Sequence, residues 1–203
     1  MESAGRKLTY EEYLALEEAL GTKHEFLDGQ VLDMAGGSPQ HAALSARVTA
    51  ALSRNLGAGP CVAFSSDLKL FVAARNRATF ADAVVVCGPL VRAEHDRNAV
   101  TNPTLIVEVF SDATEAEDRG EKFAGYGTLP SFREYLLVDQ HDPCVEVFRR
   151  NDDGTWTLQR HGPGDVVRLT SVPAQFPVDE LYAGLELEPR VRKPRLVPHA
   201  GEG

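Results

Sequence analysis

The chain has 203 residues, of which 43% are hydrophobic and 25% charged, so we expect one soluble globular domain with a well-buried core. Its formal net charge of −9 argues against tight, nonspecific nucleic-acid binding, although it leaves room for a local basic groove. No run approaches the roughly 18 apolar residues of a membrane span, and no apolar segment of a secretory signal follows the N-terminus, so we expect no membrane contact and a cytoplasmic location.

The N-terminal part of the sequence predicts two helices separated by a hairpin. A capping-box pattern begins at Thr9 and is followed by apolar residues at roughly helical spacing, which predicts a first helix over residues 10–20. Residues 24–34 have the pattern of a hairpin with an Asp-Gly turn. Ser38, followed by a proline, then opens the longest predicted helix, residues 39–56.

The middle of the chain predicts three strands, at residues 61–64, 68–73 and 81–87. A polar turn at residues 75–77 separates the second strand from the third. Segment 88–102 is rich in charged residues, so we expect a mobile loop there.

The C-terminal half predicts an apolar strand within residues 103–111, a helix over about 115–126 and a second apolar strand at 133–139. Two alternating segments, 145–149 and 156–160, then predict an antiparallel edge hairpin.

The last elements are a short strand at residues 166–169 and a helical turn that begins at Asp179 as its cap. Together these elements predict a single α/β or α+β domain over residues 1–188, with a partly parallel sheet, flanking helices and a C-terminal antiparallel hairpin extension. We expect the Pro- and Arg-containing residues 189–203 to form a disordered tail.

Two acidic residues interrupt otherwise apolar strands. Glu108 lies inside its strand and Asp82 lies at the start of another. A buried, ionised carboxylate is costly unless it is paired or coordinates a cation. Two such acids on two core strands therefore suggest a metal site. The alternatives are a buried ion pair between Glu108 and an arginine, and a backbone-capping role for Asp82.

The order of these elements and acids resembles the Uma-type restriction endonucleases, a family in the PD-(D/E)XK nuclease superfamily. The resemblance covers about residues 9–187 and implies a restriction-endonuclease-like core. It is carried by six segments in the expected order, namely residues 25–29, 38–41, 81–86, 105–111, 118–122 and 134–139.

The resemblance implies a Mg²⁺-dependent endonuclease acting on DNA, with Mn²⁺ as a substitute for Mg²⁺. Asp82 and Glu108, helped by the Val109 carbonyl, would hold the cation, and Glu25 would complete the acidic cluster. These oxygen ligands suit Mg²⁺, which polarises a phosphoryl oxygen and helps to generate hydroxide. A lysine would orient the attacking water.

The sequence departs from the superfamily pattern at two positions. Ala81 replaces the usual proline before the first acid, and Phe110 stands where the catalytic lysine is usual. Lys122, on the following helix, is the natural substitute for this lysine. The alternative is that Lys122 only pairs with Asp118 on a solvated helix face.

Other polar residues have both a functional and an ordinary interpretation. His41 either lines the same cleft or is a partly buried histidine bonded to a backbone carbonyl. Glu25 is either a site acid or a surface acid paired with Lys23 or Arg47. Asp67 is more typical of a turn than of the site. Cations that either contact phosphates or are simply solvated are Lys69, Arg75 and Arg77.

Cys61, Cys87 and Cys144 are odd in number and widely spaced, so we expect buried thiols rather than disulfides. A rival to the nuclease is a catalytically weak or inactive module that keeps the fold to bind nucleic acid or a protein partner, favoured by Phe110 and the acidic charge. A homodimer through an edge strand at residues 145–149 is compatible with either function.

Overall fold

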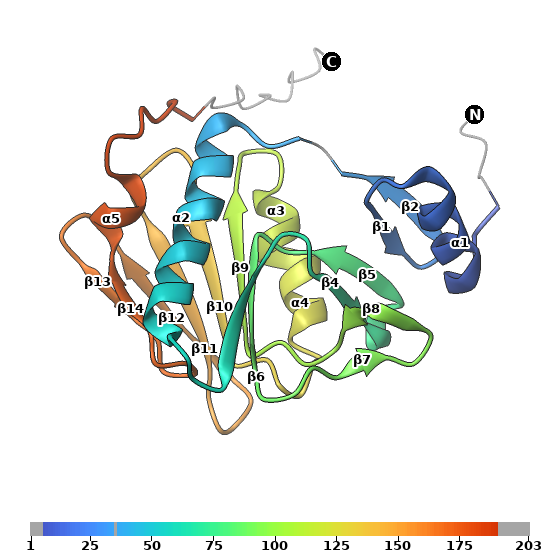
Figure 1. Cartoon of the computed structure of the whole chain (residues 1–203). Helices are drawn as coiled ribbons and strands as arrows, with labels where there is room; N and C mark the ends of the chain where they lie inside the picture. The colour runs from blue at the N-terminus through green and yellow to red at the C-terminus, as the bar shows by residue number, and fades with distance from the viewer. Residues whose placement is uncertain (1–5, 35, 191–203) are drawn as a thin grey trace, which may run out of the picture.

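The computed structural model of the chain describes residues 6–34 and 36–190. It contains two six-stranded mixed sheets, with helices packed around them (Figure 1). The elements of the first sheet and the helix beside it are α1 (Tyr10–Leu20), β1 (His24–Leu27), β2 (Gln30–Asp33), β4 (Lys69–Val72), β5 (Arg77–Phe80), β7 (Arg92–Ala93) and β8 (Asp96–Val100). Their order in the sheet is β2-β1-β5-β4-β8-β7.

The second sheet carries the predicted acidic strands. Its strands are β3 (Cys61–Ser65), β6 (Ala83–Cys87), β9 (Leu105–Phe110), β10 (Glu134–Asp139), β11 (Val145–Arg150) and β12 (Trp156–His161). They are arranged in the order β12-β11-β10-β9-β6-β3. Only β9 and β10 pair in parallel, while the other neighbours are antiparallel. The predicted partly parallel sheet of an α+β fold is therefore confirmed.

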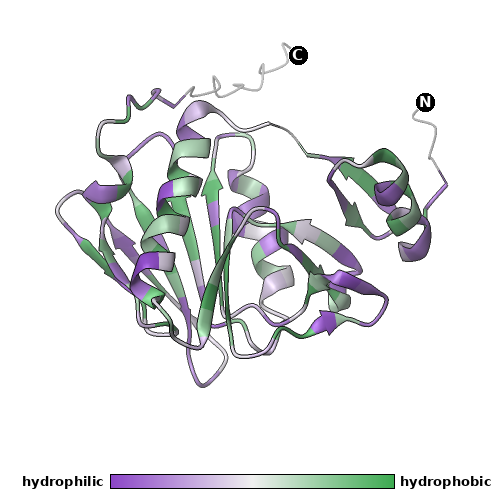
Figure 2. Ribbon diagram, viewed as in Figure 1, coloured by the Kyte–Doolittle hydropathy of each residue, from purple (hydrophilic) through white to green (hydrophobic). Residues whose placement is uncertain are grey.

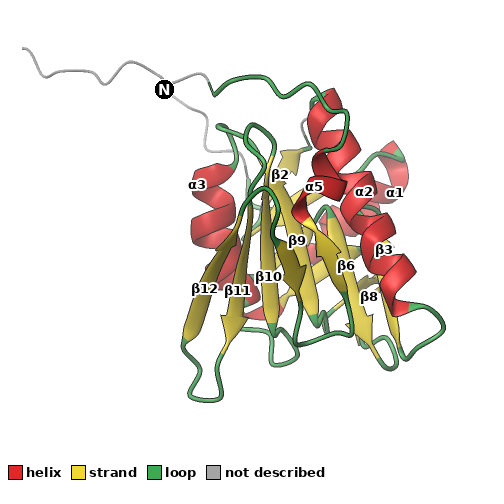
Figure 3. Cartoon of the chain, turned by 90° about the vertical axis from the view of Figure 1, so that its left-hand side faces the viewer, coloured by secondary structure: helices red, strands yellow, loops and turns green. Residues whose placement is uncertain are grey.

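Helices cover both faces of this second sheet (Figure 3). On one side lie α2 (Pro39–Leu56) and α5 (Val178–Tyr182), beside the small sheet of β13 (Val166–Arg168) and β14 (Gln175–Pro177). On the other side lies a helical segment made of α3 (Glu115–Glu117), a π-helical turn (Asp118–Lys122) and α4 (Phe123–Tyr126). The predicted C-terminal antiparallel extension corresponds to β11–β12 and the small sheet.

The side chains of β9 alternate between two hydrophobic cores. Val107 packs with Leu44 of α2 in one core, whereas Ile106 and Phe110 pack with Val72 of the first sheet in the other. Because both faces are covered, β9 is apolar at every position except Glu108, and Figure 2 shows mainly hydrophobic colour on this strand. The acid within β9 therefore lies between the two sheets.

Most predicted elements are confirmed, and three segments differ. Residues 77–80 form the strand β5, whereas the predicted turn ended at residue 77 and no element was predicted for residues 78–80. The predicted loop 88–102 contains the β7–β8 hairpin. Alternation is weak in both segments because buried charged side chains interrupt it, Arg77 in β5 and Asp96 in β8. Asp179 does not cap α5, whose N-cap is Pro177.

The strand at 145–149 is not an edge strand, because β12 covers it. A dimer formed through an edge of this sheet would have to use β12 or β3.

The cysteine prediction is wrong for two of the three residues. Cys61 and Cys87 form a disulfide, and Cys144 is a buried free thiol. The antiparallel register places Cys61 directly opposite Cys87, with 3.9 Å between the Cα atoms. The pairing depends on the β3–β6 register, which spacing along the chain does not reveal.

The predicted tail falls mainly on residues 191–203, which lie outside the described residues. Its first part is described, and there Arg190 pairs with Asp139, Asp112 and Glu115. No helix in the described part of the chain is long and apolar enough to span a membrane.

Candidate functional site

Asp82 and Glu108 face the same side of the second sheet. In the antiparallel pairing of β6 with β9, Ala83 lies opposite Val107. Continuing this register by one residue places Asp82 opposite Glu108, and opposite residues share a face. Both acids line one pocket of about 290 Å³ between the sheets. The pocket is lined by Glu25, Leu32, Asp33, Met34, His41, Phe80, Asp82, Glu108, Val109, Thr114, Glu117, Asp118 and Lys122.

Glu108 is buried, with 4% of its surface exposed. Its Oε1 atom accepts a hydrogen bond from Lys122 Nζ at 3.2 Å and another from the Tyr126 hydroxyl at 2.9 Å. Burial raises the pKa of Glu108 to about 8, against the opposing effect of Lys122, and the charges of Asp118 and Asp82 raise it further. The cation beside Glu108 is thus a lysine, not the arginine considered as an alternative.

The side chain of Lys122 points into the pocket and not into solvent. Besides Glu108, its Nζ atom lies 3.3 Å from Asp118 Oδ1 and 4.0 Å from Glu25 Oε1. Burial alone would lower the pKa of Lys122, but the surrounding acidic groups, chiefly Glu108, outweigh it and hold this pKa well above its ordinary value. Lys122 is therefore an ammonium ion, and the alternative of a solvated helix face is wrong.

Asp82 is held by a backbone amide and a histidine. Its Oδ2 atom accepts a hydrogen bond from Val109 N at 2.7 Å and lies 3.2 Å from His41 Nε2. The bond to Asp82 raises the pKa of His41, which favours the charged imidazolium. His41 sits in the first turn of α2, where Ser38 caps its backbone amide, so its ring reaches Asp82 and not a backbone carbonyl. The amide-capping alternative for Asp82 is therefore present in the structure.

Glu25 reaches the pocket from the other sheet. Its carboxylate accepts hydrogen bonds from the Thr79 hydroxyl and, at 2.8 Å, from the Arg77 guanidinium, which also donates to Glu117. Arg77 has only 3% of its surface exposed, because it pairs with these acids at the sheet interior. Glu25 therefore lines the pocket with Arg77 as its partner, and neither Lys23 nor Arg47 pairs with it.

The other candidates for phosphate contacts, Lys69 and Arg75, and the candidate for a further site acid, Asp67, lie outside this pocket. Lys69 is buried and pairs with Asp96 at 3.2 Å, so it is neither solvated nor available to a phosphate. Asp67 is exposed and pairs with Lys23 at 2.6 Å, as the turn interpretation expected. Arg75 is exposed.

Asp118 also lines the pocket, whereas its spacing from Lys122 in the sequence predicts only an ion pair between the two. It is buried, with 2% exposed, and its Oδ1 atom has no hydrogen-bond partner among the described residues. The Tyr135 hydroxyl donates to the Asp118 carbonyl and holds this turn against β10. The spacing of Asp118 and Lys122 was a signal for the pair, but only the burial of the π-helical turn shows that both face the pocket.

The carboxylate side chains that line the pocket are of the chemical type that binds a hard divalent cation. Asp82, Glu108 and Asp118 offer carboxylate oxygens, which Mg²⁺ and Mn²⁺ prefer, and Asp118 Oδ1 is ion-paired with Lys122 but accepts no hydrogen bond among the described residues. Within residues 6–34 and 36–190, no three His, Cys, Asp or Glu side chains lie together as a ready metal-binding group. The Lys122 ammonium is in contact with two of these three acids.

Comparisons with known proteins agree with this fold. The chain is 38% identical over 179 residues to uncharacterized protein slr1290 from Synechocystis sp., covering 88% of this chain and 93% of that protein. It is 34% identical over 151 residues to uncharacterized protein sll1609 from the same organism, covering 74% and 85%. The crystal structure of a "putative nuclease belonging to DUF820" from Anabaena variabilis superposes with a TM-score of 0.64 at 15% identity, covering 82% of this chain and 96% of that one.

The nuclease-like fold expected from the sequence is thereby confirmed. The Uma2 family, described as "Putative restriction endonuclease", matches residues 10–179. Since this match spans most of the sequence, the chain belongs to the Uma2 family of restriction-endonuclease-like proteins.

Proposed function

We propose that this protein is an endonuclease that uses Mg²⁺, or Mn²⁺ in its place, to hydrolyse phosphodiester bonds in DNA. One observation carries the proposal: Asp82, Glu108 and Lys122, from three separate elements, meet in a single pocket between the two sheets. Two acids on one face beside a buried ammonium are a combination that phosphodiester hydrolysis can use, and buried charges are costly to keep in a core.

Each residue of the pocket has a role that follows from its contacts. Asp82 and Glu108, with the Val109 carbonyl, would hold a divalent cation that supplies polarisation of a phosphoryl oxygen and activation of water. Lys122 is charged, so it acts as a hydrogen-bond donor that orients the attacking water and offsets negative charge, and not as a base that accepts its proton. Glu25 contributes negative charge that Arg77 balances.

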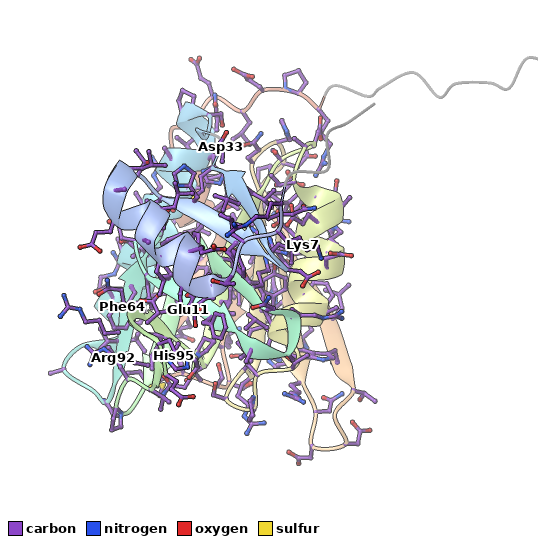
Figure 4. The ribbon with its side chains drawn as sticks, turned by 90° about the vertical axis from the view of Figure 1, so that its right-hand side faces the viewer. Lys7, Glu11, Asp33, Phe64, Arg92 and His95 are labelled. Atoms are coloured by element: carbon purple, nitrogen blue, oxygen red, sulfur yellow. A yellow bond between two sulfur atoms is a disulfide. The ribbon has the colours of Figure 1, made fainter. Side chains whose placement is uncertain are left out.

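A second, larger pocket next to the site supports a polyanionic substrate. It has a volume of about 890 Å³, and Phe80 lines both pockets. Arg92 and Arg97 line the larger pocket, and in the described part of the chain neither forms an ion pair. Figure 4 shows Arg92 and His95 at one end of this face of the molecule and Asp33, which lines the smaller pocket, toward the other. A DNA strand would meet unpaired cations along this path.

The test is cleavage of supercoiled plasmid DNA by the purified protein with Mg²⁺ or Mn²⁺. We expect nicking that EDTA abolishes, and Asp82→Ala and Glu108→Ala variants at least about 100-fold slower, because each loses a ligand of the cation. Asp152→Ala, which removes an exposed acid outside both pockets, should cut at the wild-type rate. Cutting that persists undiminished in both site variants would refute the proposal.

The second candidate is a module that binds nucleic acid or a protein partner without cleaving. Phe110 in the usual lysine position and the lack of a ready three-acid group in the described residues favour it. Calorimetric titration with Mn²⁺ separates the two functions. Heat of binding that Glu108→Ala abolishes supports the enzyme, whereas DNA binding without any Mn²⁺ binding at millimolar concentration supports the module.

A further inference from the structure

We propose that the Lys122 ammonium is the resident cation of the pocket, that a divalent ion competes with it for Glu108, and that Asp118 holds Lys122 in the pocket once Glu108 is taken. The inference depends on the proposed function only in assuming that the pocket takes a divalent ion. It assigns Asp118 as a positioning residue that acts through Lys122.

The contacts of Lys122 place it where a second cation would also have to lie. Its Nζ atom is 3.2 Å from Glu108 Oε1, the same oxygen that accepts the Tyr126 hydroxyl at 2.9 Å. A divalent ion bound to this carboxylate would stand within a few ångströms of the ammonium, and two cations at such a distance repel strongly inside a protein. Binding the ion and keeping the Lys122–Glu108 contact are therefore mutually unfavourable.

Asp118 provides a second carboxylate with which the Lys122 ammonium can pair. Its Oδ1 atom lies 3.3 Å from Lys122 Nζ, yet this oxygen has no hydrogen bond among the described residues. Asp118 is four residues before Lys122 on the same helical segment, so the two side chains are neighbours whatever happens at Glu108. The flexible four-carbon stem of lysine allows the small shift from Glu108 toward Asp118.

In the part of the chain that the structure describes, no three acids stand ready as a metal-binding group, and in this pocket the Lys122 ammonium contacts two of the acids, Glu108 and Asp118. With the ammonium in contact with Glu108 and Asp118, part of the negative charge of the pocket is already offset from within. Removing that ammonium should make the acids more available to an added cation.

The test measures Mn²⁺ affinity by calorimetry on the full chain, without DNA. We expect Lys122→Met to bind Mn²⁺ about tenfold more tightly than wild type, a coupling of ordinary size for two linked sites. Lys122→Arg, which keeps the charge, should stay close to wild type. Lys69→Met is the matched control, since Lys69 is also buried and paired with an acid, Asp96, but lies outside the pocket. Its affinity should change less than about twofold.

A double-mutant cycle tests the role of Asp118. In the wild-type background Asp118→Asn should weaken Mn²⁺ binding about fivefold, because Lys122 then relies more on Glu108. In the Lys122→Met background the same change should have no effect, since Asp118 acts through Lys122. An equal loss in both backgrounds would make Asp118 a ligand and overturn its assignment as a positioning residue.

Thermal unfolding covers the case in which a variant folds poorly. Lys122→Met leaves Glu108 and Asp118 without their cation, so Mn²⁺ should raise its Tm more than that of wild type, or restore folding if the metal-free variant is unfolded. Wild-type binding of Mn²⁺ with no gain in Lys122→Met overturns this inference alone. Absence of Mn²⁺ binding in both proteins overturns the inference and the proposed metal-dependent function together.

Discussion

Glu108 shows how a single buried acid is kept in a hydrophobic core. Two donors, Lys122 and Tyr126, bind the same oxygen of its carboxylate, while Asp82 and Asp118 add negative charge nearby. Burial outweighs the two donors and raises the pKa of Glu108 to about 8. The acid is therefore poised to change its charge near neutral pH.

This pKa predicts how the metal-free protein responds to pH. Because the folded pKa of Glu108 lies above its ordinary value of about 4.5, its contribution to stability is full below that value and is lost as the pH rises through about 8. Glu108→Gln should remove this part of the pH dependence. Urea unfolding in EDTA between pH 5 and 9 measures it, with the exposed acid Glu18 changed to Gln as the control. An unchanged slope in Glu108→Gln would contradict the assigned pKa.

Glu134 connects β10 to the loop between β13 and β14. Its fully buried carboxylate accepts hydrogen bonds from Arg149 Nε at 2.7 Å and from the backbone amides and hydroxyls of Thr170 and Ser171. Burial alone would raise the pKa of Glu134, but these donors, led by Ser171, outweigh it and lower the pKa. The Glu134 side chain thus connects the small sheet of β13 and β14 to the second sheet.

We predict that Glu134→Gln destabilises the protein by about 2–4 kcal/mol at pH 7, because a charged acceptor of several buried hydrogen bonds is lost. Since the folded pKa is lowered, this contribution is present above the ordinary pKa of about 4.5 and disappears as the pH falls through the folded value. Urea unfolding over a pH series should show a large difference from wild type at pH 7 that shrinks as the pH falls below the ordinary pKa. Glu180→Gln, on the exposed side of α5, is the control.

At the scale of the whole molecule, acidic and basic side chains are unevenly distributed and unevenly paired. The formal net charge is −9, yet most of the acids in the site are paired internally, and the unpaired Arg92 and Arg97 line the pocket that adjoins it. Figure 2 shows hydrophilic colour on the β7–β8 hairpin that carries them. Two arginines without an ion pair among the described residues therefore lie beside the site of an acidic protein, in a pocket that also contains acids such as Glu18 and Asp67.

We predict that Arg92→Ala/Arg97→Ala weakens DNA binding about tenfold in the absence of divalent ions and reduces the slope of log affinity against log salt by about 2 for duplex DNA, because two phosphate contacts are lost. Fluorescence anisotropy over a salt series measures both. Arg133→Ala/Arg168→Ala removes the same charge from exposed positions outside the two pockets. Equal losses in both double variants would show that only net charge matters.

The sequence by itself indicated the helices, the apolar strands and the acids at positions 82 and 108, because periodicity and an isolated carboxylate in an apolar run are local properties. The resemblance to the Uma-type family added Glu25. It also indicated Lys122 as the replacement for the lysine missing at Phe110. The sequence did not reveal β5 or the β7–β8 hairpin, where buried charges break the alternation.

Only the tertiary structure decided which side chains meet. The β6–β9 register sets Asp82 opposite Glu108, the β3–β6 register joins Cys61 to Cys87, and the packing of the π-helical turn buries Asp118 with Lys122. Register and packing depend on contacts between segments far apart in the chain. For that reason the partners of each acid, and the resulting charges, become visible only when the two sheets are assembled.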